Sequence, residues 1–279
     1  MDLFSRQIEK VKSEQTRKLV MFLLCLILLG LSPIGIASAE QATSSTMSIS
    51  RESVQKRKDT VDLNQWAKDT GDILVSPKHW KSSDWNNCLL YGGLTYLISE
   101  NDKHIQSWFQ GDNNSTSHTD SFATVGNALP YAGIAYMTGA YFLGNEKQRQ
   151  FATTGLESVA ITTLFTEVAK AAIHKQRPDG SDNSSFPSWH AASAFALATV
   201  FADEYSKDKA VPYIAYGLAS LTAYGRLKDN KHWASDIFIG ALIGHYTAKS
   251  VIALNKSHTL QLQPYATSNT VGLVVSKQY

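Results

Sequence analysis

Residues 148–174 read QRQFATTGLESVAITTLFTEVAKAAIH, and this stretch decides the predicted fold class most clearly. It is rich in alanine and other apolar residues, is long enough for several helical turns, and lacks the polar–apolar alternation of a half-buried strand. Further stretches of the same character follow along the chain. They span residues 86–99, 120–143, 190–205, 211–226 and 232–254. The sequence therefore predicts an all-α fold.

The segments outside these stretches differ in character. Residues 101–119 are mostly polar and contain the turn signal GDNN, so they are predicted to form a loop. The C-terminal tail, residues 256–279, alternates polar and apolar residues at 259–263, continues through TSNT and is rich in β-formers at 271–276. That order of alternation, turn and β-formers predicts a short C-terminal β-hairpin.

The N-terminus has the three parts of an export signal. Basic residues lie within residues 1–18, the uncharged run LVMFLLCLILLGL occupies residues 19–31, and the small-residue triplet Ala-Ser-Ala ends at Ala39. This order predicts a secretory signal peptide over residues 1–39, with an uncleaved N-terminal anchor as the alternative. In either case the rest of the chain is exported, to the periplasm or the extracellular space. Residues 40–60 are rich in Ser, Thr, Gln and Lys and are interpreted as a linker before a helical domain at 61–255.

Composition excludes some classes of protein. The 26 basic and 24 acidic residues give a net charge of +2, which argues against binding nucleic acid through bulk charge. The mean hydropathy is −0.18, so the helices are interpreted as a soluble domain, with peripheral membrane contact left open. Of the two cysteines, Cys25 lies in the N-terminal apolar run and Cys88 is expected to be a small buried residue.

Three short segments carry the residue types that phosphate chemistry requires. They are KAAIHKQRP at residues 170–178 (K-x6-R-P), SFPSWHA at 185–191, and RLKDNKHWASD at 226–236 (R-x5-H-x3-D). The arginines offer a bidentate fork that matches phosphate oxygens. Asp236 follows His232 by four residues, so the two share a face if the segment is helical. An Asp bonded to one imidazole nitrogen would fix the tautomer and leave the other nitrogen free to attack.

Each of these residues alone also has a purely structural interpretation. His232 and Asp236 alone would be a surface ion pair, and Lys170 and Lys175 alone would be solvated charges at a helix end. Ser188 alone would be a helix N-cap. Because all the segments occur in this order within residues 170–236, a functional site is favoured over coincidence.

At these residues the chain resembles the type-2 phosphatidic acid phosphatase superfamily, which includes bacterial acid phosphatases, lipid phosphatases and vanadium haloperoxidases. The family signature is K-x6-R-P, P-S-G-H and S-R-x5-H-x3-D, and the resemblance covers about residues 120–250. It implies a helical bundle of the bacterial acid phosphatase type. The implied activity is metal-independent hydrolysis of a phosphate monoester or lipid phosphate, with no cofactor.

The resemblance also implies a role for each motif residue. His232 would be the nucleophile that forms a phosphohistidine, Asp236 would orient it, and His190 would protonate the leaving alcohol. The phosphoryl oxygens would be held by Lys170, Arg177, Ser188, the backbone amide of Trp189, and Arg226. The positive end of the helix that begins near His232 would help to bind the anion.

Two positions depart from the signature. Gly225 stands where the third motif has Ser, and Trp189 stands where the second has Gly. The Trp189 side chain would narrow the pocket, stack on a substrate, or disable the site. A non-catalytic phosphate-binding relative is therefore an alternative to a phosphatase, and a vanadium haloperoxidase is a further one.

Overall fold

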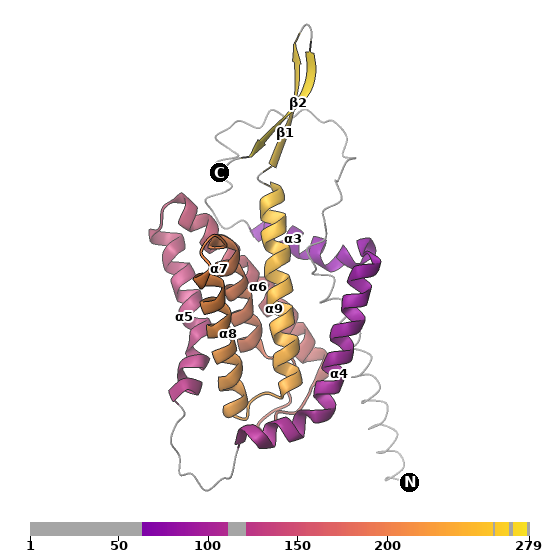
Figure 1. The fold of residues 1–279 in the computed structure, drawn as a ribbon, viewed down its shortest axis with the longest axis vertical. Helices are drawn as coiled ribbons and strands as arrows, with labels where there is room; N and C mark the ends of the chain where they lie inside the picture. The colour runs from indigo at the N-terminus through magenta and orange to yellow at the C-terminus, as the bar shows by residue number, and fades with distance from the viewer. Residues whose placement is uncertain (1–62, 111–120, 259, 268–269, 278–279) are drawn as a thin grey trace.

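The computed structural model describes residues 63–110, 121–258, 260–267 and 270–277 of the 279-residue chain. The predicted signal peptide or anchor and the predicted linker lie outside the described residues. The described helices are α3 (Leu63–Val75), the 3-10 helix η1 (Ser76–His79), α4 (Ser82–Gln110), α5 (Ser121–Leu143), α6 (Glu146–Ile173), α7 (Trp189–Glu204), α8 (Ala210–Lys228) and α9 (Ala234–His258). Figure 1 shows them gathered into one bundle, which confirms the predicted all-α class.

The C-terminal end forms two strands. Strands β1 (Leu260–Thr267) and β2 (Thr270–Lys277) pair antiparallel, with Leu260 opposite Lys277 and Thr267 opposite Thr270. The pair follows α9 directly and stands beyond the end of the bundle in Figure 1. The backbone of this region thus has the predicted hairpin.

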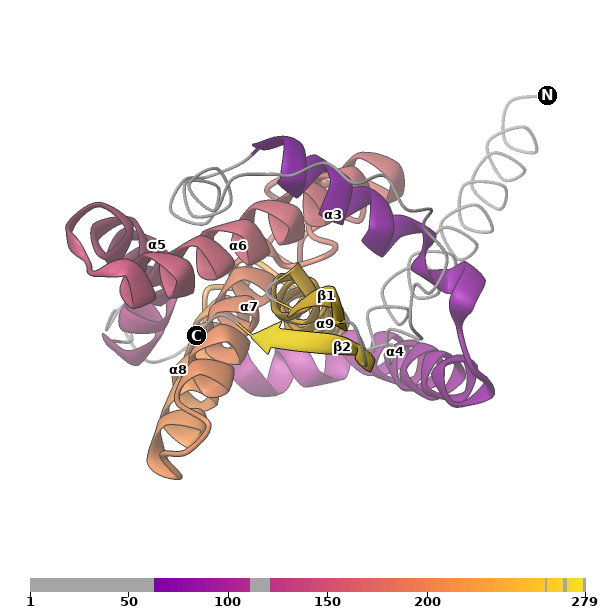
Figure 2. The same ribbon diagram turned by 90° about the horizontal axis from the view of Figure 1, so that it is seen from above.

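Helix α7 forms the centre of the bundle and packs against α6, α8 and α9 (Figure 2). Its residues 191–194 and 196–200 are all buried, and most of them are small. Small side chains allow the α9 backbone to come very close. A Cβ atom built on Gly244 would lie 1.9 Å from the carbonyl oxygen of Ala192, so only glycine fits at this crossing.

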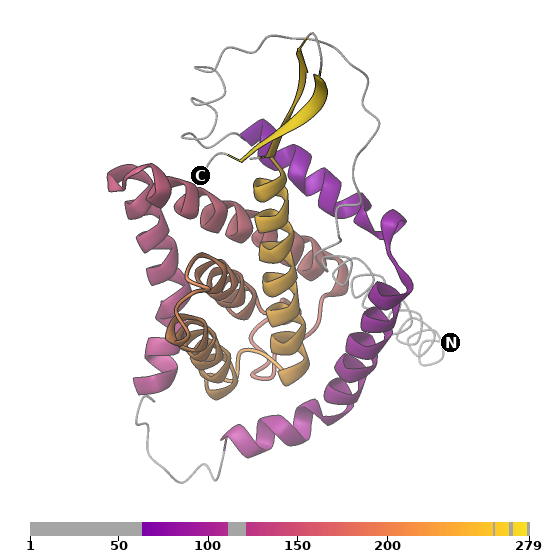
Figure 3. The same ribbon diagram turned by 45° about the horizontal axis from the view of Figure 1, so that its top comes forward.

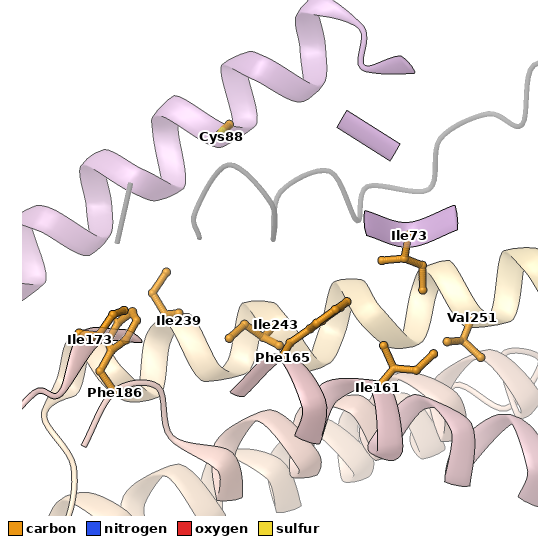
Figure 4. Close-up of a cluster of buried hydrophobic side chains, with 9 residues drawn as sticks. All are labelled: Ile73, Cys88, Ile161, Phe165, Ile173, Phe186, Ile239, Ile243 and Val251. Atoms are coloured by element: carbon orange, nitrogen blue, oxygen red, sulfur yellow. The ribbon is translucent and has the colours of Figure 1, made fainter. Parts of the chain in front are cut away.

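A second part of the core lies between α9 and α6. Ile239, Ile243 and Val251 of α9 pack with Ile161 and Phe165 of α6, as Figure 4 shows. Each such side chain contributes about 1.5–3 kcal/mol through burial. The same cluster receives one residue from α3 and one from α4, so it ties the N-terminal helices to the bundle. These two residues are Ile73 and Cys88, the latter buried as expected.

Helix α4 is longer than the sequence predicted. Residues 101–110, expected to belong to a polar loop, continue the helix, which runs along one side of the bundle (Figure 3). The buried side chains at this end are polar. Gln106 donates hydrogen bonds to the carbonyl of Leu227, at 3.0 Å, and to the Asn230 side chain, at 2.6 Å. A helix anchored by polar groups has no apolar periodicity to reveal it.

One described helix meets the length and composition expected of a membrane span. The segment Ala234–Lys256 of α9 has a mean hydropathy of 1.5, but half of its most apolar window is buried inside the protein. A helix that packs against several others in a bundle can have the same character, because much of its surface is buried.

Candidate active site

The helix ends nearest the three motifs surround an open cavity of about 260 Å³. Six of the predicted site residues line it, together with two residues that the sequence did not single out. The lining residues are Thr163, Glu167, Lys170, Arg177, Trp189, His190, Arg226 and His232. The remaining predicted residues, Ser188 and Asp236, are fully buried behind the cavity wall.

Helix periodicity explains which α6 residues face the cavity. Thr163, Glu167 and Lys170 are spaced by four and three residues, so they share one face of the last turns of α6. Arg226 lies in the last turn of α8, and His232 lies two residues before α9. The functional side chains are thus held by rigid helix ends.

The imidazole of His232 has a defined tautomer. Its Nδ1 lies 2.6 Å from the backbone carbonyl of Ser185, an acceptor, so Nδ1 carries the proton. Its Nε2 lies 3.3 Å from Nη1 of Arg177, which can only donate, so Nε2 carries the lone pair. Burial, followed by the charges of Arg226 and Arg177, holds the pKa of His232 well below its usual range. The ring is therefore neutral and can act as a nucleophile through Nε2.

Asp236 does not hold His232 in the way that the sequence suggested. Its Oδ2 lies 3.9 Å from Nδ1 of His232, beyond hydrogen-bond distance. The same oxygen accepts hydrogen bonds from the Ser185 hydroxyl, at 2.5 Å, and from the Trp233 amide, at 2.9 Å. The expected direct contact is thus replaced by an indirect one, since Asp236 fixes Ser185 and the Ser185 carbonyl fixes the histidine.

His190 faces the cavity from the first turn of α7. Its Nε2 lies 3.2 Å from the hydroxyl of Tyr131 on α5. Burial lowers the pKa of His190 to about 4, with further lowering by the charges of Arg226, Lys170 and Arg177. An anion bound among these cations would offset their effect and raise the pKa of His190.

The three cations differ in how fully they are already paired. Lys170 lies 2.6 Å from Glu167, and Arg177 donates through Nε to both oxygens of Asp182. Arg226 contacts the Asn127 side chain at 3.3 Å through Nη1, but its buried Nε has no hydrogen-bond partner among the described residues. A buried unsatisfied donor at the wall of a cavity points to a ligand that would accept from it.

The second motif begins α7. The Ser188 hydroxyl accepts from the Ala191 amide at 3.4 Å and does not line the cavity, so the geometry gives it the position of an N-cap. The Trp189 indole lines the cavity and donates through Nε1 to Thr163 Oγ1 at 2.8 Å. The first-turn amides of Trp189 and His190 have no partner within the helix, which makes the start of α7 an anion-binding position.

The start of α9 is used differently from the prediction. The Ser235 amide donates to Asp102 at 2.9 Å, and the preceding Trp233 amide donates to Asp236. Two carboxylates therefore already satisfy this helix end, and the positive helix end at the cavity wall belongs to α7.

Several residues of the site escaped the sequence analysis. Thr163 and Glu167 share the face of Lys170, so helical spacing could have found them. Lys175, interpreted as a solvated charge if taken alone, is instead ion-paired to Asp102 and Asp236. No sequence signal marks Tyr131 or Asp102, because both come from helices far away in the chain. Within the residues that the structure describes, no group of three or more His, Cys, Asp or Glu side chains is arranged to hold a metal ion.

Comparison with known proteins finds relatives of the part of the chain that carries the motifs. Residues 151–259 match the model of the PAP2 superfamily, which confirms the resemblance to the type-2 phosphatidic acid phosphatase superfamily that the motifs indicated. A lipid A 1-phosphatase from Porphyromonas gingivalis is 30% identical over 153 residues, which cover 54% of this chain and 33% of that protein. The chain thus spans about a third of the length of this relative. A crystal structure of Aquifex aeolicus LpxE has a TM-score of 0.46 and 21% identity, covering 55% of this chain and 94% of that one.

Proposed function

We propose that this chain is a phosphatase that removes a phosphate group from a lipid through a phosphohistidine at His232. The observation that carries the proposal is the tautomer of His232. Its Nε2 carries a lone pair, and the ring lines a cavity together with Lys170, Arg177 and Arg226. Its Nδ1 donates a proton in a hydrogen bond to the Ser185 carbonyl. A neutral nucleophile among fixed cations is the arrangement that phosphoryl transfer requires.

The first step of the proposed reaction transfers the phosphoryl group to the enzyme. Nε2 of His232 attacks phosphorus, and the P–O bond to the alcohol breaks. His190 donates its proton to the departing oxygen, since the bound phosphate has raised the pKa of its imidazole. The proton of His232 remains on Nδ1 throughout, and its hydrogen bond to the Ser185 carbonyl stabilises the positive charge that develops on the ring.

The second step releases phosphate. Neutral His190 takes a proton from a water molecule as that water attacks phosphorus, and the P–N bond to His232 breaks. Arg226, Lys170 and Arg177, with the amides at the start of α7, stabilise the equatorial oxygens in both transition states. The proposed steps use only side chains and amides of this chain, without a metal or a cofactor.

A lipid phosphate is the favoured substrate class because the cavity has an apolar and aromatic side. The Trp189 ring lies 5.4 Å from the Tyr131 ring and 5.1 Å from the His190 ring. Tyr131 is 54% exposed beside the acid, where the leaving group would lie. Aromatic faces suit an acyl chain, an isoprenoid or an aromatic ester better than a sugar. The similarity to a lipid A 1-phosphatase also favours a lipid phosphate as the substrate.

The proposed setting is outside the cytoplasm, at a membrane surface. The basic and apolar N-terminus supports export, with either a cleaved signal or a retained anchor. Exposed apolar side chains on α4, among them Leu89, Leu90 and Leu97, support peripheral contact with lipid.

A substrate panel tests this function. The purified full-length chain would be assayed in detergent for phosphate release from lipid A, phosphatidic acid, phosphatidylglycerophosphate, an isoprenyl pyrophosphate, an aryl phosphate and a sugar phosphate. We expect release from at least one lipid substrate, a much lower rate on the sugar phosphate, and none with His232→Ala. Phosphate binding without any release would favour a non-catalytic relative. Halide oxidation that depends on added vanadate would indicate a haloperoxidase.

A further inference from the structure

Lys175 lies behind the nucleophile and is fully occupied by protein partners. Its ammonium group lies 2.9 Å from Asp102 Oδ2, 2.8 Å from Ser235 Oγ and 2.8 Å from Asp236 Oδ1. An ammonium has three donors, so none remains for a substrate. Lys175 is also absent from the lining of the cavity. Whatever it contributes to the site must act through its neighbours.

Asp102 brings the long helix α4 into the same cluster. Its Oδ1 accepts from the Ser235 amide at 2.9 Å, and its Oδ2 accepts from the Ser235 hydroxyl at 2.5 Å as well as from Lys175. The residue is 5% exposed, although it carries a charge. A buried carboxylate of this kind is stable only with its partners in place.

The cluster reaches the nucleophile through Asp236 and Ser185. Asp236 accepts from Lys175 on one oxygen and from the Ser185 hydroxyl on the other. The Ser185 amide donates to the Lys175 carbonyl at 2.9 Å, so Lys175 holds Ser185 from two directions. The Ser185 carbonyl in turn holds the Nδ1 proton of His232. A continuous series of hydrogen bonds thus joins α4 to the histidine ring.

We propose that Lys175 and Asp102 are positioning residues that set the orientation and the tautomer of His232. This inference rests on the proposed function for its catalytic consequence, but the geometry that it concerns is that of the free enzyme. It also assigns α4, which lies outside the residues that match the superfamily model, a part in building the site.

The two carboxylates of the cluster share a single cation. Two buried carboxylates, Asp102 and Asp236, contact Lys175, and Asp102 also accepts from Ser235. Burial raises the pKa of Asp236, while the charge and the hydrogen bond of Lys175 oppose that rise. The other groups that face Asp236 are Ser185 from the α6–α7 connection and Trp233 and His232 from the segment before α9; the cations Arg177 and Arg226 lie farther off, around His232.

Removing the charge of Lys175 and removing that of Asp102 should shift the pKa of Asp236 in opposite directions. Without Lys175, two adjacent carboxylates would lack a cation, and Asp236 would take up a proton at a higher pH. A proton on Oδ1, the oxygen that Lys175 would no longer contact, removes the negative charge of Asp236 and weakens the hydrogen bonds that Oδ2 accepts from Ser185 and Trp233. Without the charge of Asp102, Lys175 would act on Asp236 alone and would keep it ionised to a lower pH.

The test compares Lys175→Met with Asp102→Asn by the pH dependence of kcat/KM on the best substrate of the panel. The acidic limb is the fall of kcat/KM on the low-pH side of the profile. We expect its midpoint to shift to higher pH by about one unit in Lys175→Met and to lower pH in Asp102→Asn. In the double variant the midpoint of the acidic limb should lie between those of Lys175→Met and wild type, because the negative charge of Asp102 beside Asp236 is also removed. Lys175→Arg should keep the limb near that of wild type. Opposite shifts cannot arise from a general loss of stability.

Lys256→Met serves as the matched control. Lys256 pairs with Asp203 at 2.8 Å, as Lys175 pairs with its carboxylates, but it lies near the far end of α9. The rise of a helix puts the two ends of α9 about 33 Å apart from residue 234 to residue 256. We expect no shift of the acidic limb in this variant.

A second measurement needs no substrate. Proton–nitrogen correlation spectra of the histidine rings report the tautomer of His232, assigned by its loss in His232→Ala. We expect Nδ1–H in wild type and a mixture of tautomers in Lys175→Met. An unshifted limb together with a wild-type tautomer in Lys175→Met would overturn the inference and leave the phosphatase proposal intact. A wild-type protein inactive on every phosphate would overturn the proposed function, and the ring spectra would then decide the positioning role by themselves.

Discussion

Gly240 offers a direct test of how the helix crossing shapes the site. This residue of α9 lies against the carbonyl of Ser188, the residue that precedes Trp189 and His190 in the chain. A Cβ atom at position 240 would lie 2.5 Å from that carbonyl oxygen and 3.4 Å from the Cβ of Ala191. The oxygen belongs to the backbone and cannot rotate away, so α7 itself would have to move by about 1 Å to reach ordinary contact.

The expected cost of Gly240→Ala follows from this overlap. Alanine improves helix propensity by about 1 kcal/mol, whereas overpacking a buried contact costs about 1–3 kcal/mol. We expect the free energy of unfolding to fall by about 1 kcal/mol. A shift of about 1 Å in His190 and in the amides at the start of α7 would lower kcat/KM by about a hundredfold.

Gly217→Ala is the matched control, measured by denaturant unfolding and by kcat/KM on the same substrate. Gly217 lies within α8, and a Cβ atom there would meet nothing within 4 Å. That variant should gain up to about 1 kcal/mol and keep its activity. If Gly240→Ala behaved like Gly217→Ala in both measurements, the close approach of α9 to the start of α7 would not be what positions the site.

Three further predictions concern the histidines and Trp189. His190→Ala should lower kcat/KM far more on an alkyl phosphate than on an activated aryl phosphate, because a good leaving group needs little acid assistance; equal losses would contradict its role as the acid. The pKa values of His190 and of His245, which bonds Thr199 and Tyr216, are lowered to about 4 by burial, so the unfolded chain binds more protons between pH 4 and 6.5. Stability should be full above about pH 6.5 and fall toward pH 4, by up to about 1.4 kcal/mol per pH unit for each histidine; unfolding titrations should show a slope that His245→Gln flattens, and an unchanged slope would refute this linkage. Trp189→Gly should leave a working enzyme whose preference for lipid over soluble phosphates falls about tenfold in kcat/KM, whereas a gain on every phosphate would mean that the indole obstructs the cavity.

The fold class and most of the cavity lining could be predicted from the sequence. Apolar helical stretches and fixed motif spacing are local signals, and Lys170 and Arg226 do lie in the last turns of long helices while His232 lies just before another. The end of α4 could not be predicted in the same way. Its contacts with the bundle include those of the buried polar residues Asp102 and Gln106, which are typical of loops.

The contacts that support His232 also leave no local signal in the sequence. The acceptor of the His232 proton is a backbone carbonyl, which every residue carries and no sequence pattern distinguishes. Asp236 and Lys175 act through Ser185, and Asp102 joins them only because α4 packs beside α9. Such contacts depend on the tertiary arrangement of helices that are distant in sequence.

Trapping the phosphorylated enzyme tests whether His232 is the nucleophile. His190→Ala would be mixed with a phosphorus-labelled aryl phosphate, because loss of the base should slow hydrolysis of the intermediate more than its formation. The reaction would be quenched in alkali, digested and mapped by mass spectrometry. We expect one labelled peptide that carries phosphohistidine at His232 and no label when His232 is replaced by alanine. Phosphate release from wild type without any labelled histidine, or with the label on another residue, would contradict it.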